Sequence, residues 1–417
     1  MYSATQEYIR QHADDDVRQL ALQGTKNPEV DLSWALNQIA GRQQARSKLP
    51  TWAAIEGIVY PPHLSMEQCS SELTARYKAK ILAASRKQES LLEGREALVV
   101  DLSAGFGVDL AYISQYFQRA VHVEQQEQLC AISSENYRLL GLNHIEVDCT
   151  DGIDYLHRLD HADLIFIDPA RRNEHGGRTY GIADCTPNVL EIREELLQKA
   201  CRVLLKLSPM LDWRKAVNDL GHDCVSEVHI VSVGNECKEL LILLKGKTEE
   251  KDEGWDDGEK QSLRVVCVNL LPDNSEERFE FDAFTTLPVN TPQLPLLASQ
   301  YLYEPNASIM KAGCFDELAL RYGMSQLSAN SHLFVSDEEK EYFPGRRFLI
   351  ERVTSMNKRE LKSALAGISQ ANITVRNFPL SVAELRRRLK LSDGGTAYIF
   401  ATTLNDKRHV LLVCQRI

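Results

Sequence analysis

Four acidic residues stand at the ends of four short apolar runs in the middle of this 417-residue sequence. Asp101 follows "LVV", Glu124 follows "VHV", Asp148 follows "IEV" and Asp168 follows "LIFI". Asp is a poor strand former, so its place after each aliphatic run predicts a buried strand that ends in a carboxylate. The carboxyl ends of parallel strands share one edge of a sheet, which is where ligands bind. The spacing therefore predicts one acidic ligand site at that edge.

A glycine turn follows the first of these acids in the stretch "DLSAGFG", residues 101–107. Gly105 and Gly107 lack a Cβ, so the backbone there can approach a ligand closely. A dinucleotide fingerprint would need a third glycine where Leu110 stands. An acid beside the turn suits a cationic ligand better than a pyrophosphate, which disfavours an NAD-dependent oxidoreductase.

The surrounding sequence alternates strand and helix patterns, which predicts a parallel sheet with helices on both faces. Strands are expected at 97–103, 119–124, 144–149, 164–169 and 202–208, with helices at 108–117, 126–141, 152–160 and 186–200. Residues 226–246 predict an antiparallel strand pair at the sheet edge, and residues 263–284 predict a further hairpin. Residues 1–90 are expected to be helical, with Ser65 capping a helix. The C-terminal region is expected to be α+β.

Charge is spread unevenly along the chain. Residues 341–417 hold 14 Lys and Arg against 6 Asp and Glu, a balance of +8, whereas the whole chain carries −11 and the first 340 residues therefore −19. A basic tail on an acidic body indicates a polyanionic partner.

Other features exclude several classes of protein. The N-terminus lacks the apolar core of a signal peptide, and no apolar run approaches the roughly 20 residues that span a bilayer. Ten cysteines are scattered without a C-x-x-C pair, which is typical of reduced thiols in a cytoplasmic protein. We expect neither a membrane association nor a metal site.

The ordered set Asp101, Gly105, Gly107, Glu124, Asp148 and Asp168-Pro169, together with the late antiparallel pair, resembles a class I S-adenosylmethionine-dependent methyltransferase. The resemblance covers roughly residues 65–290 and implies a Rossmann-like sheet that binds S-adenosylmethionine. It implies that Asp101 and the turn hold the methionine part, Glu124 the ribose, and Asp148 with Cys149 the adenine. The full implied donor site is Asp101, Ser103, Ala104, Gly105, Gly107, Glu124, Gln125, Asp148, Cys149 and Asp168.

More narrowly, "YPPHLSMEQCSSELTARYKA", "DPARR" and "YEPNASIMKAG" are similar to a bacterial methyltransferase group with a ferredoxin-like insert and a THUMP-like C-terminal domain. This resemblance covers nearly the whole chain. It implies a helical region at 1–90, a methyltransferase domain at 91–290, a ferredoxin-like domain at 291–345 and a THUMP-like domain at 346–417. THUMP domains in other enzymes bind structured RNA, so phosphate contacts are expected from Arg346, Arg347, Arg387 and Lys390.

Amino-group methyltransferases acting on bases commonly carry Asp or Asn, then Pro-Pro and an aromatic residue, at the end of the fourth strand. There the acidic or amide oxygen holds the target amine and the aromatic ring stacks on the base. This chain keeps Asp168-Pro169, which are the expected catalytic residues, but continues Ala170-Arg171-Arg172. Tyr180 or an arginine plane can supply the stacking surface. Alternatively, Arg171 and Arg172 clamp a phosphate or a carboxylate, or pair with a structural acid.

The leading hypothesis is a methyltransferase acting on a base nitrogen of structured RNA, either tRNA or rRNA. One alternative is a methyltransferase acting on a small molecule or a protein. Another is a non-catalytic protein that binds the donor or RNA.

Overall fold

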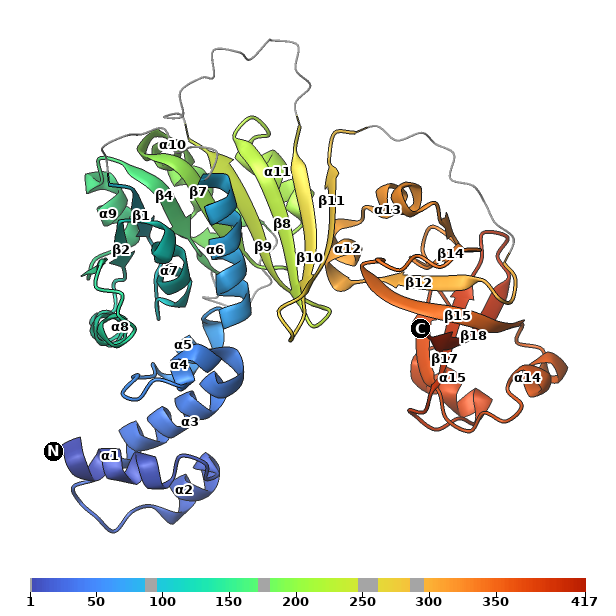
Figure 1. The fold of residues 1–417 in the computed structure, drawn as a ribbon, viewed down its shortest axis with the longest axis horizontal. Coiled ribbons are helices and arrows are strands. Elements are labelled where there is room, and N and C mark those ends of the chain that lie inside the picture. The colour runs from blue at the N-terminus through green and yellow to red at the C-terminus, as the bar shows by residue number, and fades with distance from the viewer. Residues whose placement is uncertain (1, 87–95, 172–180, 247–261, 286–295) are drawn as a thin grey trace. The chain divides into compact units, whose positions relative to one another are not determined.

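The structure is a computed structural model, and it describes residues 2–86, 96–171, 181–246, 262–285 and 296–417. Two compact units make up the chain (Figure 1). Unit 1 comprises Met1–Val228 and Glu239–Gln261, and unit 2 comprises His229–Lys238 and Ser262–Ile417. No helix among the described residues combines the length and the apolar character that crossing a membrane requires.

Unit 1 begins with helices, as the sequence predicts. They are α1 (Tyr2–Gln11), α2 (Val17–Gln23), α3 (Leu32–Lys48), α4 (Pro50–Ala53), α5 (His63–Gln68) and α6 (Glu72–Arg86). Asp16 caps α2 and Asp31 caps α3, each with a carboxylate that accepts from backbone N–H groups of the first turn.

The cap expected at Ser65 is wrong, because α5 begins after Pro62 and Ser65 lies inside it. The helical pattern that starts at Ser65 is divided between α5 and α6, since the backbone becomes extended at Cys69. The Ser70 side chain donates instead to the buried carboxylate of Asp109, at 2.7 Å between the two oxygens. Ser71 then caps α6, because its hydroxyl oxygen accepts from the backbone N of Thr74 at 3.3 Å.

The sheet of unit 1 has the strand order β8-β9-β7-β4-β1-β2-β3, in which β8 takes part through its first residues. Its strands are β1 (Leu98–Asp101), β2 (Arg119–Val123), β3 (Ile145–Asp148), β4 (Ala162–Ile167), β7 (Ala200–Leu207), β8 (Val225–Val233) and β9 (Glu236–Lys245). Strands β3, β2, β1, β4 and β7 run parallel, whereas β9 pairs antiparallel to β7. The predicted Rossmann-like methyltransferase sheet with antiparallel last strands is confirmed.

Helices connect these strands. They are α7 (Val108–Ile113), α8 (Glu127–Leu139), α9 (Gly152–Arg158), α10 (Val189–Lys199) and α11 (Trp213–Leu220), with one-turn helices η1 (Ser114–Tyr116) and η2 (Ile182–Asp184). A short antiparallel pair, β5 (Ala170–Arg171) and β6 (Cys185–Thr186), follows the end of β4. Because β1, β2 and β4 are mostly buried, their side chains pack between the helices and leave the carboxyl ends for polar residues, whereas β3 is only partly buried.

Unit 2 holds the end of β8 with β10 (Arg264–Leu270) and β11 (Glu276–Asp282), and the predicted hairpin of β10 and β11 is confirmed. A seven-stranded sheet follows, in the order β13-β14-β12-β15-β18-β17-β16. These strands are β12 (Tyr301–Pro305), β13 (Ser325–Gln326), β14 (Phe334–Ser336), β15 (Gly345–Thr354), β16 (Asn372–Arg376), β17 (Ala397–Thr403) and β18 (His409–Arg416). Its helices are α12 (Ala307–Ala312), α13 (Phe315–Tyr322), α14 (Lys358–Ala364) and α15 (Val382–Leu389).

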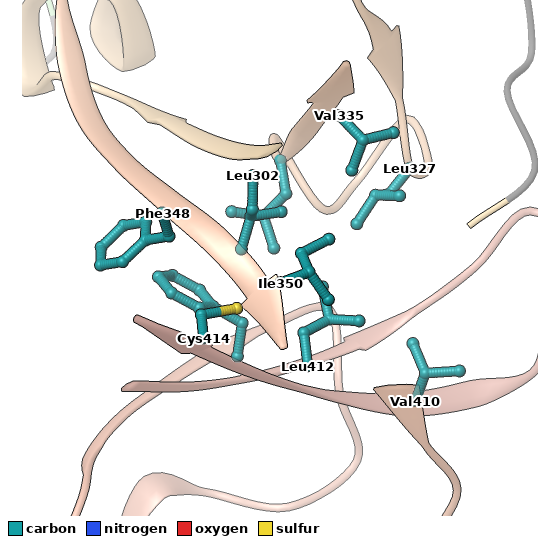
Figure 2. Close-up of a cluster of buried hydrophobic side chains, with 10 residues drawn as sticks. Leu302, Leu327, Val335, Phe348, Ile350, Val410, Leu412 and Cys414 are labelled. Carbon is teal, nitrogen blue, oxygen red and sulfur yellow. The ribbon is translucent and has the colours of Figure 1, made fainter. Parts of the chain in front are cut away.

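One apolar core joins the two halves of this C-terminal sheet. Leu302 from β12 and Val335 from β14 pack with Phe348 from β15 and Leu412 from β18 (Figure 2). β12 also pairs directly with β15. The residues before and after position 345 therefore form a continuous sheet.

Candidate active site

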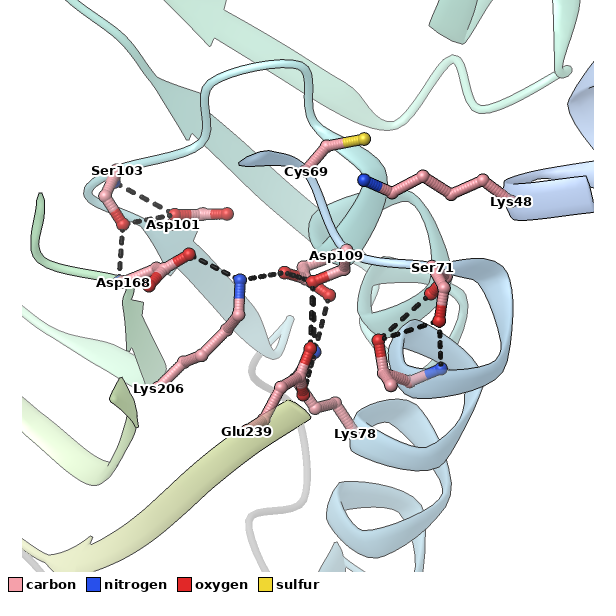
Figure 3. Close-up of polar contacts among 12 residues, drawn as sticks. Lys48, Cys69, Ser71, Lys78, Asp101, Ser103, Asp109, Asp168, Lys206 and Glu239 are labelled. Carbon is pink, nitrogen blue, oxygen red and sulfur yellow. Dashed lines mark hydrogen bonds and ion pairs between the residues drawn. The ribbon is translucent and has the colours of Figure 1, made fainter. Parts of the chain in front are cut away.

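Asp101 and Asp168 lie at the ends of the adjacent strands β1 and β4, and Ser103 links them. Asp101 is 1% exposed, and its Oδ1 accepts from the backbone N of Ser103 at 2.9 Å. The backbone N of Asp168 in turn donates to Ser103 Oγ at 2.7 Å. Burial raises the pKa of Asp101 well above its ordinary range, and the negative charges of Asp109 and Asp168 raise it further. The carboxylates are thus held close together at one sheet edge (Figure 3).

The glycine turn after β1 is held by its neighbours on both sides. Both glycines have left-handed backbone angles, with φ of 56° at Gly105 and 80° at Gly107. The backbone N of Gly105 donates to Glu124 Oε2 at 3.1 Å, while Glu124 Oε1 accepts from the backbone N of Gln126 at 2.8 Å. The Ala104 backbone N donates to the carbonyl of Val123 at 3.0 Å. The turn therefore lies against the end of β2.

The buried side chain of Tyr137 packs against Gly107 of this turn. Tyr137 donates its hydroxyl hydrogen to the Gly107 carbonyl at 3.1 Å and contacts His122 Nδ1 at 2.9 Å. Burial lowers the pKa of His122 to about 3, so the imidazole is neutral at physiological pH. Since the tyrosine has one hydrogen, these contacts require the proton of His122 on Nδ1.

The remaining predicted donor residues lie at or follow the carboxyl ends of β2 and β3. The backbone N of Glu124 donates to the Asp148 carbonyl at 3.2 Å, so the two acids are neighbours. Asp148 is partly buried and forms an ion pair with Arg158, 2.7 Å between Oδ2 and the guanidinium nitrogen. Gln125 and Cys149 are exposed.

The structure brings four further charged residues, Lys78, Asp109, Lys206 and Glu239, to the same place. Lys206 from β7 contacts Asp168 Oδ2 at 2.5 Å and Asp109 Oδ2 at 3.8 Å. Lys78 from α6 is fully buried and contacts Glu239 Oε2 at 2.6 Å and Asp109 Oδ1 at 3.0 Å. Figure 3 shows the resulting chain of contacts from Asp168 through Lys206 and Asp109 to Glu239.

This network is net negative even with Asp101 protonated, because two lysines face the three carboxylates of Asp109, Asp168 and Glu239. Burial alone would lower the pKa of Lys206, but the carboxylates of Asp168, Asp109 and Glu239 outweigh it and raise the pKa. Burial raises the pKa of Asp109, but Lys78 and Lys206 lower it below its ordinary value. Lys206 is therefore a fixed cation, and the site as a whole favours a cationic ligand.

A sequence signal for these residues existed. Lys206 interrupts the apolar run "VLLKL" of a predicted buried strand, and such a lysine requires an anionic partner. Asp109 directly follows the glycine turn in "GFGVD". Glu239 carried no comparable signal, since its partner Lys78 lies 161 residues away.

The predicted substrate contacts lie in different places. Pro169 is buried at the end of β4, and Arg171 lies in β5, whereas Arg172 and Tyr180 lie outside the described residues. In unit 2, Arg346 pairs with buried Glu304, and Arg347 contacts Glu339 at 3.1 Å. Arg387 and Lys390 are exposed at the C-terminal end of α15.

Comparison with known proteins gives matches over the whole chain. The family model described as THUMP domain-like matches residues 345–416, and the one described as a ferredoxin-like domain matches residues 301–344. A crystal structure from Porphyromonas gingivalis W83, described as a methyltransferase, is 31% identical with a TM-score of 0.80, covering 99% of this chain and 97% of that one. The chain belongs to this methyltransferase family. Its sheet, ferredoxin-like region and THUMP-like region identify the class I S-adenosylmethionine-dependent group, for which S-adenosylmethionine is the methyl donor.

More distant structures have been matched as well. An RNA methyltransferase from Pyrococcus horikoshii is 11% identical with a TM-score of 0.36, covering 50% of this chain and 98% of that one. A S-adenosylmethionine-dependent methyltransferase from Agrobacterium tumefaciens is 17% identical with a TM-score of 0.29, covering 41% and 62%. Both TM-scores are too low to relate these two proteins to the methyltransferase family of this chain. No curated protein matches the sequence.

Proposed function

We propose that this protein methylates a nitrogen of a base in structured RNA, either tRNA or rRNA, in the cytoplasm. The observation that carries the proposal is the position of Asp168-Pro169. Asp168 ends the fourth parallel strand, its backbone is bonded to Ser103, and its carboxylate is paired with Lys206. Methyl transfer to an amine requires an oxygen that accepts its hydrogen bond, and Asp168 supplies one beside the glycine turn.

We assign the donor site to the residues around the glycine turn. Asp101, Ser103, Ala104, Gly105 and Gly107 would hold the methionine part of S-adenosylmethionine, which supplies an electrophilic methyl group when bound. A Cβ added at Gly105 would meet no atom nearer than 3.9 Å, so the turn has open space on that side. The net negative charge of the network fits a sulfonium.

The outer residues would hold the nucleoside part of the donor. Glu124 would accept from the ribose hydroxyls, with Gln125 beside it. Asp148 and Cys149 would lie at the adenine. Because Asp148 is already paired with Arg158, its contact with an exocyclic amine would share the carboxylate with that guanidinium.

Catalysis would depend on positioning of the acceptor. Lys206 contacts one oxygen of Asp168, Oδ2, so we assign the other oxygen, Oδ1, to the acceptor amine. Burial raises the pKa of Asp168 while Lys206 opposes this, and 37% of the side chain remains exposed. We therefore expect the carboxylate form at neutral pH, able to accept the amine proton after transfer, directly or through water.

Substrate recognition would come from two regions. Near the donor we propose Pro169, Arg171, Arg172 and Tyr180, with an arginine plane or Tyr180 stacking on the base. In the THUMP-like domain, which we place at residues 346–417, Arg387 and Lys390 would contact phosphates. Arg346 and Arg347 would contribute only if they exchange their partners Glu304 and Glu339 for RNA.

The test supplies tritiated S-adenosylmethionine to the purified protein with total RNA from a strain that lacks its gene. Wild type, Asp168→Ala and the control Asp219→Ala are run side by side, because Asp219 is a partly exposed acid on α11 that pairs with Lys215 in the same helix. Label in RNA with wild type and the control, but not with Asp168→Ala, supports the proposal. Nuclease digestion of the labelled RNA then identifies the modified nucleoside.

Other results select the alternatives. Label in protein or in small molecules, with none in RNA, would show that the methyl acceptor belongs to that class and not to RNA. Calorimetric donor binding without label in any cellular fraction would indicate a non-catalytic protein. Label in RNA that persists in Asp168→Ala would remove Asp168 from the chemistry.

A further inference from the structure

Ser70 lies between α5 and α6 and brings the N-terminal helical region into contact with the proposed methyl-transfer site around Asp168. The residue is 5% exposed, and its hydroxyl donates to Asp109 Oδ2 at 2.7 Å. Lys78 Nζ donates to Ser70 Oγ at 3.2 Å, so the single hydrogen of the hydroxyl remains for a carboxylate. Asp109 is the nearer acceptor, because Glu239 Oε1 lies at 3.3 Å. The directions of these hydrogen bonds are therefore determined.

The Asp109 oxygen that accepts from Ser70 is also the one that faces Lys206. Lys206 Nζ lies 3.8 Å from Asp109 Oδ2 but 2.5 Å from Asp168 Oδ2, so one ammonium group lies between two carboxylates (Figure 3). Lys78 Nζ lies 3.0 Å from the other oxygen of Asp109, Oδ1. Each oxygen of Asp109 thus has a nearer partner than Lys206, which leaves the ammonium of Lys206 to Asp168.

We propose that Ser70 is a positioning residue of the methyl-transfer site, because its hydroxyl holds Asp109 Oδ2 and so keeps Lys206 paired with Asp168. This inference rests on the proposed function, in which Asp168 Oδ1 accepts from the amine of the methyl acceptor. Without the hydroxyl, the buried Oδ2 of Asp109 would lack its hydrogen bond. The flexible stem of Lys206 would then let its ammonium group move toward Asp109 and away from Asp168.

The charges around Asp168 determine what this movement would change. Four charged groups act on Asp168 and a fifth acts on Lys206; they are Asp101 on β1, Asp109 on α7, Lys78 on α6, Lys206 on β7 and, beside Lys206, Glu239 on β9. Burial raises the pKa of Asp168 and Lys206 lowers it, so a more distant Lys206 leaves this pKa higher. At acidic pH more of Asp168 is then protonated and unable to accept the amine proton. Loss of the Ser70 hydroxyl should therefore slow transfer most at acidic pH.

The test compares wild type with Ser70→Ala, the conservative variant Ser70→Thr and the control Ser71→Ala, whose lost hydroxyl contacts Thr74 in α6. Single-turnover methyl transfer to total RNA is measured across the pH range in which the proteins are folded. Ser70→Ala should be about tenfold slower than wild type on the acidic limb and within about twofold on the plateau. Ser70→Thr keeps a hydroxyl and should restore the wild-type profile, and Ser71→Ala should retain it.

A second measurement needs no methyl acceptor. Carbon NMR of protein labelled at its aspartate carboxyl groups follows the titration of Asp168 in the substrate-free protein, with Asp168→Asn assigning the signal. Ser70→Ala should move this titration to higher pH, whereas Ser71→Ala should not. If no methyl group enters RNA but the titration moves, the proposed function is wrong and the positioning by Ser70 holds.

Two results would overturn the inference. One is a Ser70→Ala protein that loses rate by the same factor at every pH, which is the result expected of a serine with a purely structural role. The other is an Asp168 titration that is the same in wild type and Ser70→Ala. Circular dichroism checks that each variant is folded. If Ser70→Ala does not fold, Ser70→Cys replaces it, because a thiol is a weaker donor and should move the titration in the same direction.

Discussion

Individual charged residues determine the character of the proposed active site. Lys78 and Lys206 lie among buried carboxylates, and each lysine contacts Asp109. Asp109 therefore joins two ion pairs that come from different elements, α6 with β9 on one side and β4 with β7 on the other. Removing a lysine leaves a buried carboxylate without its nearest cation, Glu239 in the case of Lys78 and Asp168 in the case of Lys206, which is a costly change.

Lys78→Met should destabilise unit 1 by roughly 3–5 kcal/mol, because it leaves Glu239 and Asp109 without their shared cation. Lys80→Met, an exposed change on the same helix, should stay within about 0.5 kcal/mol. Urea unfolding followed by circular dichroism measures both. The double variant Lys78→Met with Glu239→Gln should lose less than the sum of its parts. Equal stability of Lys78→Met and Lys80→Met would show that the ion pair of Lys78 with Glu239 contributes nothing to stability.

Asp101→Asn should stabilise the fold at neutral pH and weaken donor binding by about 10- to 100-fold, because an amide cannot become negatively charged opposite the cationic donor. The pKa of Asp101 is raised in the folded state, so the unfolded chain loses its proton first as pH rises above about 4. Wild type thus loses stability above that pH, and the advantage of the variant should vanish below it. Urea midpoints at pH 4 and pH 7, with donor binding by calorimetry, test both effects. A variant advantage that is the same at both pH values would contradict the raised pKa.

At the scale of elements, the turn between β1 and α7 depends on what lies on each side of it. Tyr137 from α8 occupies the space below Gly107, and a Cβ added there would lie 2.0 Å from the tyrosine hydroxyl. Gly105 faces open space on the other side. The two glycines are therefore needed for different reasons, one for packing and one for approach of a ligand.

Gly107→Ala should destabilise the protein by more than about 2 kcal/mol, since it combines backbone strain with a clash in the core. Gly105→Ala should cost only about 1 kcal/mol, for the strain of its positive φ. Both variants should bind the donor more weakly, which calorimetry measures after thermal unfolding has ranked their stability. Unchanged donor binding in a folded Gly105→Ala protein would move the donor away from this turn.

At the scale of the whole molecule, the proposed methyl-transfer site and the proposed RNA-binding surface carry opposite charge. The proposed donor site in unit 1 is net negative, whereas α15 in unit 2 presents exposed Arg387, Arg388 and Lys390. Arg386 on the same helix is instead partly buried and paired with Asp393. Affinity for RNA and chemistry on RNA should therefore be separable by substitution.

Replacing Arg387, Arg388 and Lys390 by Ala should weaken RNA binding without changing donor binding. Three lost phosphate contacts should lower the slope of log K against log salt by about 2–3. The matched control replaces Lys358, Arg359 and Lys362, which are exposed on α14. Fluorescence anisotropy with total tRNA at several salt concentrations measures the slopes. Equal slopes for the two triple variants would show that α15 has no special part in binding.

The sequence by itself determined the sheet, the turn and the four strand-end acids, because these depend on local patterns. Alternation of apolar strands and helices specifies a parallel sheet, and a parallel sheet puts the ends of β1, β2, β3 and β4 on one edge. Asp101, Glu124, Asp148 and Asp168 followed directly from that rule.

Only the tertiary structure decided which charges meet. Lys78 and Glu239 are 161 residues apart, and Asp168 and Lys206 are 38 apart, so no local period connects them. It also decided the break between α5 and α6, where bonding of Ser70 to Asp109 overrides the helical pattern. Contacts of this kind arise from how elements pack, and a buried charge reveals its partner only when the fold has brought the two together.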